Sequence, residues 1–234
     1  MKTDLSSLPK VKDVYITLLP GNNYKDVVNK ALELSKSGFN PVPHFPARSI
    51  KNLVELKDYI KRCKDVGVKQ ALVIGGSSQP IGDFHCSLQL LETGLFEGFK
   101  IGIAGHPDGS PDISDSDLKK AMIDKKPYAD YIVTQWLLDV RPIKEFISNQ
   151  TLPVHVGITG PLKISSLLKF ASIVGAKNSL DFLKSNATKA IDLLKPKDPN
   201  EIINDLKKST NNFHIYTFGG LKETNKWLTE SNYA

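Results

Sequence analysis

Short apolar runs alternate with segments of helical length along most of the chain. The clearest runs, at 71–74, 101–104 and 131–134, are rich in Val and Ile, and each is followed at once by small, polar or turn-forming residues. Such runs predict buried strands of a parallel sheet. Ligands of parallel sheets bind at the carboxyl-terminal ends of the strands, so the residues just past each run are the first candidates for chemistry.

Four further runs complete the predicted sheet, at 14–19, 40–44, 153–156 and 213–217. Helices are predicted over 24–37, 49–66, 87–95, 114–125 and 140–149, with several more between 161 and 209 and a last one that contains Trp227. This alternation predicts an α/β fold in a single domain over residues 1–234. A TIM-type (β/α)8 barrel closes at eight strands, so seven predict an incomplete or open barrel with its gap between the first and last strands. Residues 2–9 have the pattern of a helix rather than an eighth strand.

Composition narrows the class of protein. The 234 residues are 40% hydrophobic and 24% charged, which is typical of a globular protein, and no apolar stretch reaches the ~18 residues of a membrane span. Cys63 and Cys86 are not spaced as a metal clip, and only two thiols in a chain of this length favour a reducing cytoplasm. The net charge of +6 is either a lysine-rich bias or an attraction for a polyanionic ligand. No nucleic-acid motif is present.

Three polar side chains stand at predicted strand ends: His44, His106 and Gln135. His44 precedes a proline-rich loop, where a histidine is either structural or bonds a phosphate or a flavin ring. His106 lies between Gly105 and Pro107, which favour a bend that turns its imidazole into the strand-end cleft. Gln135 follows a buried run, where a side-chain amide either ties down a loop or reads a ligand amide.

A glycine-rich turn, Gly75 to Ser78, follows the run at 71–74. Its backbone N–H groups could cradle a phosphate, although the turn lacks the lysine of a Walker loop and does not match G-x-G-x-x-G. Ser77 and Ser78 lack the G-x-S-x-G elbow of a hydrolase. The histidines lack the spacing of a metal site, so no metal centre is predicted.

Seven motifs in order along the chain resemble one family. They are VPHFPAR (42–48), IGGS (74–77), LLETGLF (90–96), AGHPDG (104–109), IVTQ (132–135), GITGP (157–161) and FHIYTFGG (213–220). Together they resemble methylenetetrahydrofolate reductase, in a shorter bacterial branch of the family. The resemblance implies a (β/α)8 barrel that binds FAD. It also implies hydride transfer from NADH or NADPH through the flavin to 5,10-methylenetetrahydrofolate, which yields 5-methyltetrahydrofolate for one-carbon metabolism and methionine biosynthesis.

The same resemblance implies roles for individual residues. Gln135 matches the glutamine that contacts the folate pterin and the flavin, and Phe170 would flank the shared nicotinamide and folate face. Ser77 stands at the catalytic position of an aspartate that hydrogen-bonds the pterin. The flavin-contacting positions fall on Thr17, His44, Ile74, Gly76, Ala104 and His106, and positions near the FAD phosphates or ribityl chain fall on Asp117 and Lys120.

The chain departs from the family pattern at several positions. The glutamate of the family's first strand, which helps protonate the substrate, has no counterpart, and Gly220 replaces an arginine. His106 replaces a usual tyrosine. Two alternatives therefore stay open: direct hydride transfer from the nicotinamide without flavin, and a non-catalytic folate-binding or assembly subunit. The expected partner is a tetrahydrofolate derivative, with neither nucleic acid nor membrane, and a homo-oligomer is left open.

Overall fold

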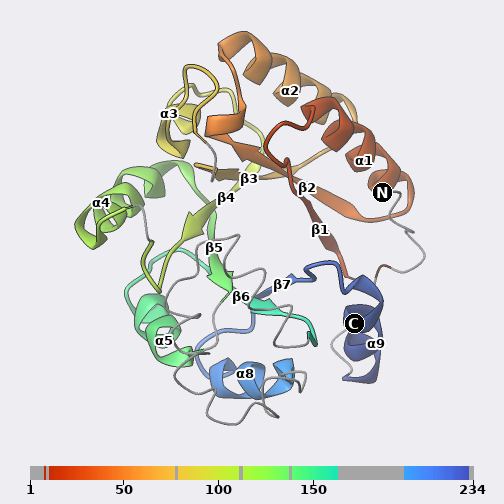
Figure 1. Cartoon of the computed structure of the whole chain (residues 1–234), viewed down its shortest axis with the longest axis vertical. Helices are drawn as coiled ribbons and strands as arrows, with labels where there is room; N and C mark the ends of the chain where they lie inside the picture. The colour runs from red at the N-terminus through yellow and green to blue at the C-terminus, as the bar shows by residue number, and fades with distance from the viewer. Residues whose placement is uncertain are drawn as a thin grey trace. The chain divides into compact units, whose positions relative to one another are not determined.

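The computed structural model describes residues 8, 11–76, 79–110, 113–136, 139–162 and 198–231. Within them, strands alternate with helices (Figure 1). The strands are β1 (Asp13–Ile16), β2 (Asn40–Pro46), β3 (Gln70–Ile74), β4 (Lys100–Gly105), β5 (Tyr131–Trp136), β6 (Val154–Thr159) and β7 (Phe213–Tyr216). The helices are α1 (Tyr24–Lys36), α2 (Leu53–Asp65), α3 (Ser87–Leu91), α4 (Asp115–Lys125), α5 (Val140–Ser148), α8 (Pro199–Leu206) and α9 (Leu221–Glu230).

The order of the strands in the sheet follows their order in the chain, from β1 at one end to β7 at the other. Strand pairs β1–β2, β2–β3, β3–β4, β5–β6 and β6–β7 are parallel. The fold is therefore α/β and TIM-barrel-like, with seven parallel strands in the part of the chain that the structure describes, which confirms the predicted fold class. The helix predicted over residues 2–9 falls almost wholly outside the described residues.

Two compact units can be described separately. The first, called here the β1–β4 unit, comprises Val11–Ala104 and Ile123–Tyr131. The second, called the β5–β7 unit, comprises Met1–Lys10, Gly105–Met122 and Ile132–Ala234. Each unit joins segments that are far apart in the sequence. The prediction of a single domain stays a prediction.

Helices α1 and α2 lie side by side in the β1–β4 unit (Figure 1). Each begins at an asparagine whose side-chain oxygen accepts a backbone N–H: Asn23 from Lys25 at 2.9 Å, and Asn52 from Glu55 at 3.0 Å. These caps satisfy N–H groups that have no partner within the helix. The helix faces that are buried carry Val27, Val28, Ala31 and Leu34 in α1, and Leu56, Tyr59, Ile60 and Cys63 in α2.

Phe45 anchors the packing of β2 against α2. Its ring is fully buried, stacks on Tyr59 with ring centroids 4.2 Å apart and meets the edge of Phe96 at 5.1 Å. Successive side chains of a strand point to opposite faces, so His44 projects from the other face of β2, away from Tyr59. The packing of Phe45 thus decides which way His44 points.

In the β5–β7 unit, the backbone of β6 approaches β5 closely. Thr134, with no exposed surface, accepts a hydrogen bond from the backbone N–H of Gly157 at 2.8 Å. A Cβ at Gly157 would lie 2.5 Å from the Thr134 carbonyl oxygen, so this position needs glycine. Helices α8 and α9 are joined by the Trp227 indole, which donates to Asn200 Oδ1 at 3.2 Å.

Several predicted boundaries differ from the structure. Residues 157–159 are strand rather than loop, because Ile158 is fully buried and pairs with Ile215 of β7. Gln135 lies inside β5 rather than after it, and His44 lies inside β2. The helix predicted from residue 49 begins at Leu53, after a 3-10 turn, since the cap is Asn52. Nearby glycines and prolines conceal two of these boundaries in the sequence, the one at His44 and the one at residues 157–159.

Candidate functional site

Five of the predicted flavin-contacting residues come together at one end of the β1–β4 unit. Thr17 follows β1, His44 lies near the end of β2, Ile74 ends β3 and Gly76 follows it, and Ala104 lies near the end of β4. The four strands are adjacent and parallel, so their carboxyl-terminal ends share one edge.

The strand register also gives three of these residues a common face. His44 pairs with Leu72, and Leu72 pairs with Gly102. Residues that pair across parallel strands share a face, as do residues two apart along one strand. His44, Ile74 and Ala104 therefore occupy the same face of the sheet, the one opposite Phe45.

His44 is the most unusual of these side chains. Both ring nitrogens are buried, and neither has a hydrogen-bond partner within the described part of the chain. The ring of Tyr15 meets it edge-on, with centroids 6.1 Å apart. Burial lowers the pKa of His44 to about 4, so its imidazole is neutral near pH 7. A buried polar group without a partner is rare in folded proteins, and an ordered water, an ion or a functional role commonly explains it.

The depressed pKa of His44 predicts a loss of stability in acid. The unfolded chain takes up the proton near the ordinary pKa of 6.5, and the folded chain takes it up only near 4. The free energy of unfolding should therefore fall as the pH drops from 6.5 toward 4, by about 3 kcal/mol from this residue. His44→Phe should remove that part of the pH dependence. Urea unfolding of both proteins at several pH values between 6.5 and 4 measures this pH dependence. If the free energy of unfolding changed with pH equally in the two proteins, the side chain of His44 would be solvated rather than buried.

Gln135 occupies a distortion of β5. The pairing of β5 with β6 shifts between Val133 and Trp136, so Thr134 and Gln135 form a bulge. Bulges commonly re-aim a side chain beside an active site. The carbonyl oxygen of Gln135 accepts from Thr134 Oγ1 at 2.8 Å, whereas its side-chain amide bonds no described residue. Two roles were predicted for this amide, holding a loop in place and binding a ligand amide. Among the described residues, the amide holds no loop.

An aromatic group near Gln135 was not predicted as functional. Phe218 stacks on Tyr216 at 5.5 Å and meets Trp136 edge-on at 5.9 Å. Phe218 has a φ of 42°, a left-handed conformation that costs energy in a residue with a Cβ. The indole nitrogen of Trp136 is buried without a hydrogen-bond partner among the described residues. Packing and ligand stacking use the same residue types, so the sequence carries no signal that separates them.

Three further predicted residues, His106, Asp117 and Lys120, lie on the segment between β4 and β5. His106 begins a turn in which Gly109 N–H donates to the His106 carbonyl at 3.1 Å, as the predicted bend requires. Asp117 and Lys120 are exposed on α4, and Asp117 Oδ2 accepts from Ser114 Oγ at 2.7 Å. These three residues, like Gln135, belong to the β5–β7 unit. Ser77 and Phe170 lie outside the described residues.

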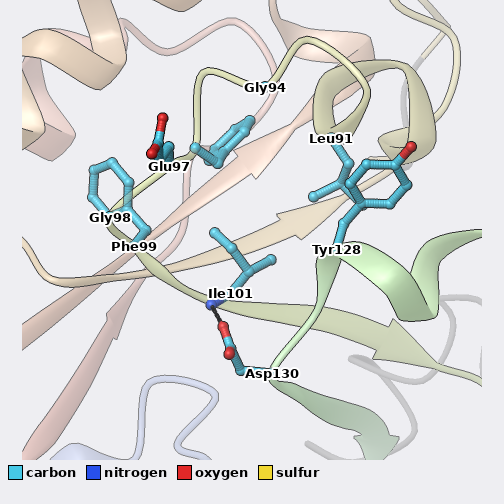
Figure 2. A pocket seen from close by; sticks show the side chains of 9 residues that line it. Leu91, Gly94, Glu97, Gly98, Phe99, Ile101, Tyr128 and Asp130 are labelled. Carbon is cyan, nitrogen blue, oxygen red and sulfur yellow. Dashed lines mark hydrogen bonds between the residues drawn. The ribbon is translucent and has the colours of Figure 1, made fainter.

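A surface hollow of the β1–β4 unit lies elsewhere. Figure 2 shows Leu91, Phe99, Ile101 and Tyr128 around it, with Ile101 N–H donating to Asp130 Oδ2 at 2.6 Å. Ile101 stands at the start of β4, so the hollow is at the amino-terminal end of that strand. Ligand sites of parallel sheets lie at the opposite end, and none of the predicted site residues lines this hollow.

Neither a metal-binding cluster nor a membrane-spanning helix is found among the described residues. No group of three or more His, Cys, Asp or Glu side chains there is arranged to hold a metal ion. The helices in the same part of the chain are too short or too polar to cross a bilayer.

Comparison with known proteins bears on the fold. No family model matches the chain. A Streptococcus agalactiae protein assigned as the copper-homeostasis protein CutC is 15% identical over 74% of this chain and 90% of that chain, with a TM-score of 0.48. A Burkholderia cenocepacia protein assigned as a phosphonomutase is 11% identical over 71% and 76%, with a TM-score of 0.45. A Ruminococcus gnavus sialic acid aldolase is 12% identical over 66% and 50%, with a TM-score of 0.41. Identities this low concern fold alone and carry no function to this chain.

Proposed function

We propose that this protein is a flavin-dependent reductase of 5,10-methylenetetrahydrofolate, similar to methylenetetrahydrofolate reductase. The observation that carries the proposal is the neutral imidazole of His44, whose two buried nitrogens have no described partner. It stands among four other residues that the sequence resemblance assigns to flavin contact, at the carboxyl-terminal ends of four adjacent strands.

The side chains at these strand ends suit an isoalloxazine ring. A flavin has a flat ring system with hydrogen-bonding atoms on its edge, and His44 offers both a donor and an acceptor when neutral. Ile74 and Ala104 are partly exposed and supply apolar surface on the same face. Gly76 has a φ of 90°, which glycine adopts without strain and which lets the loop backbone come close to a ligand.

The remaining roles follow from the resemblance and from side-chain chemistry. When bound, flavin supplies a two-electron relay from NADH or NADPH to the methylene group of the folate. Gln135 would orient the pterin, because a side-chain amide can both donate to and accept from an amide-like ring edge. Ser77 would hydrogen-bond the pterin, and Phe170 would flank the ring that is being reduced. Asp117 and Lys120 would lie near the flavin side chain.

Flavin binding and reduction test this proposal directly. The native protein, reconstituted with FAD and passed through a desalting column, should keep the visible absorption bands of oxidised flavin. Anaerobic addition of NADH or NADPH should bleach those bands, and 5,10-methylenetetrahydrofolate should restore them with formation of 5-methyltetrahydrofolate. His44→Phe should weaken flavin retention, and Val54→Ala, on the exposed surface of α2, should not.

Three outcomes would contradict the proposal. Turnover of the folate without retained flavin would assign direct transfer from the nicotinamide. Folate binding without turnover, with or without flavin, would assign a binding protein. Binding of neither ligand would remove the protein from folate chemistry altogether.

A further inference from the structure

Arg48 joins the loops that follow β2 and β3. It lies in the 3-10 turn Ala47–Ser49, directly after β2. Its backbone N–H donates to the Gly75 carbonyl at 3.0 Å, and its carbonyl accepts from Ile81 N–H at 3.1 Å. Its guanidinium donates from Nε to the His85 carbonyl at 3.0 Å and from Nη1 to the Gly76 carbonyl at 3.3 Å.

The charge of Arg48 is not neutralised by any carboxylate among the described residues. The other arginines of the chain differ: Arg62 pairs with Asp58 at 2.6 Å, and Arg141 pairs with Asp139 at 2.6 Å. Arg48 is only partly exposed, so its uncompensated charge is less well solvated than theirs. Such a cation favours an anionic ligand more strongly than a fully exposed one does.

The hydrogen bonds of Arg48 leave part of the guanidinium available. The Nε hydrogen and one Nη1 hydrogen are committed to carbonyl groups, whereas the Nη2 hydrogens and the second Nη1 hydrogen bond no described residue. Guanidinium N–H groups match the oxygens of phosphate and carboxylate in spacing. The two carbonyl bonds also hold the guanidinium in one orientation, which lowers the entropy lost when a ligand binds.

The position of Arg48 places this charge beside the candidate flavin site. Gly76, whose carbonyl Arg48 binds, is itself one of the five residues grouped at the strand ends of the β1–β4 unit. A Cβ at Gly76 would lie 3.3 Å from Pro46 Cβ and 3.7 Å from Arg48 Cβ, so the glycine loop and the Arg48 turn are in close contact.

We infer that Arg48, oriented by the Gly76 and His85 carbonyls, is an anion subsite that binds a phosphate group of the ligand held at the strand ends of the β1–β4 unit. The inference rests on the proposed function in that a flavin nucleotide carries the phosphate. No residue role assigned through the family resemblance includes Arg48.

Paired flavins that differ by one phosphate test the subsite. Riboflavin and FMN share the isoalloxazine ring and ribityl chain, so the ratio of their dissociation constants isolates the phosphate contribution. The native protein should bind FMN at least about tenfold more tightly than riboflavin, as expected for a charge-assisted hydrogen bond. Arg48→Gln should reduce that preference to about twofold or less and leave riboflavin affinity within about threefold. Arg62→Gln, the matched control, should keep the full preference.

A conservative variant separates ligand binding from loop support. Arg48→Lys keeps the charge but cannot make both carbonyl bonds, so it should keep part of the preference for FMN while lowering the melting temperature. If Arg48 only ties the loops together, Arg48→Lys and Arg48→Gln should both lose stability, and the preference for FMN should stay as in the native protein. That result would overturn the inference, and if Arg48→Gln does not fold, the Arg48→Lys comparison decides.

Failure of the proposed function would be visible separately. If the native protein binds no flavin, inorganic pyrophosphate replaces the flavins, with melting temperature as the readout. A rise in melting temperature that disappears in Arg48→Gln, is reduced in Arg48→Lys and persists in Arg62→Gln would support the subsite while the flavin proposal fails. No rise in the native protein would overturn the subsite as well.

Discussion

Phe45→Ala should lower the free energy of unfolding by about 3–5 kcal/mol. The ring is fully buried, and it contacts Tyr59 of α2 on one side and Phe96 on another. Removing it leaves a cavity between sheet and helix that rigid neighbours cannot fill, so the lost transfer energy and the cavity cost add together. Chemical unfolding followed by circular dichroism measures the change.

A matched truncation gives the control for Phe45. Val54→Ala removes an aliphatic side chain on α2 that is 76% exposed, and its effect on the free energy of unfolding should stay within about 0.5 kcal/mol.

Because His44 is adjacent to Phe45 in the chain and lies on the opposite face of β2, Phe45→Ala should also weaken flavin retention. A loss below about 1 kcal/mol would mean that β2 and α2 do not pack as described.

Gln135→Ala should impair folate binding or turnover by on the order of 1–3 kcal/mol and leave folding nearly unchanged. The side-chain amide bonds no described residue, so its removal breaks no such contact in the free protein. In the proposed complex, the loss would leave buried polar groups of the pterin without partners. Titration with 5-methyltetrahydrofolate and steady-state kinetics measure the first effect, and thermal unfolding measures the second.

Gln150→Ala is the matched control for Gln135. Gln150 lies in the loop before β6, at the end of that strand opposite the proposed site, and its Oε1 atom is buried without a described partner. Its replacement should leave folate affinity unchanged. If Gln135→Ala had native folate affinity and rate, Gln135 would have no part in ligand binding.

Much of the fold could be predicted from the sequence, because local patterns carry it. The apolar runs at 71–74, 101–104 and 131–134 lie within β3, β4 and β5. Helix α1 begins at Tyr24, as its helical spacing predicted, and Asn23 caps it. Errors arose where glycine or proline interrupted a pattern, as at 157–159, because β6 is held there by pairing with β7, which is distant in the sequence.

The candidate site was predictable in part. The rule that polar residues follow the apolar runs pointed to His44 and to the turn that contains Gly76, and the family resemblance supplied Thr17, Ile74 and Ala104. The aromatic contacts of Phe218 could not be predicted, since they join β5 to the segment after β7. The same limit applies to Arg48, because only the folded chain brings Gly76 and His85 to its guanidinium.

The sequence by itself determined the α/β class, the order of strands and helices, and the residues available at the strand ends. Only the tertiary structure decided their physical state: that both nitrogens of His44 are buried, that Gln135 lies in a bulge, and that Arg48 has no carboxylate partner in the part of the chain that the structure describes. The physical reason is that periodicity depends on near neighbours in the chain. Solvation, strand register and charge pairing depend on which distant residues come into contact.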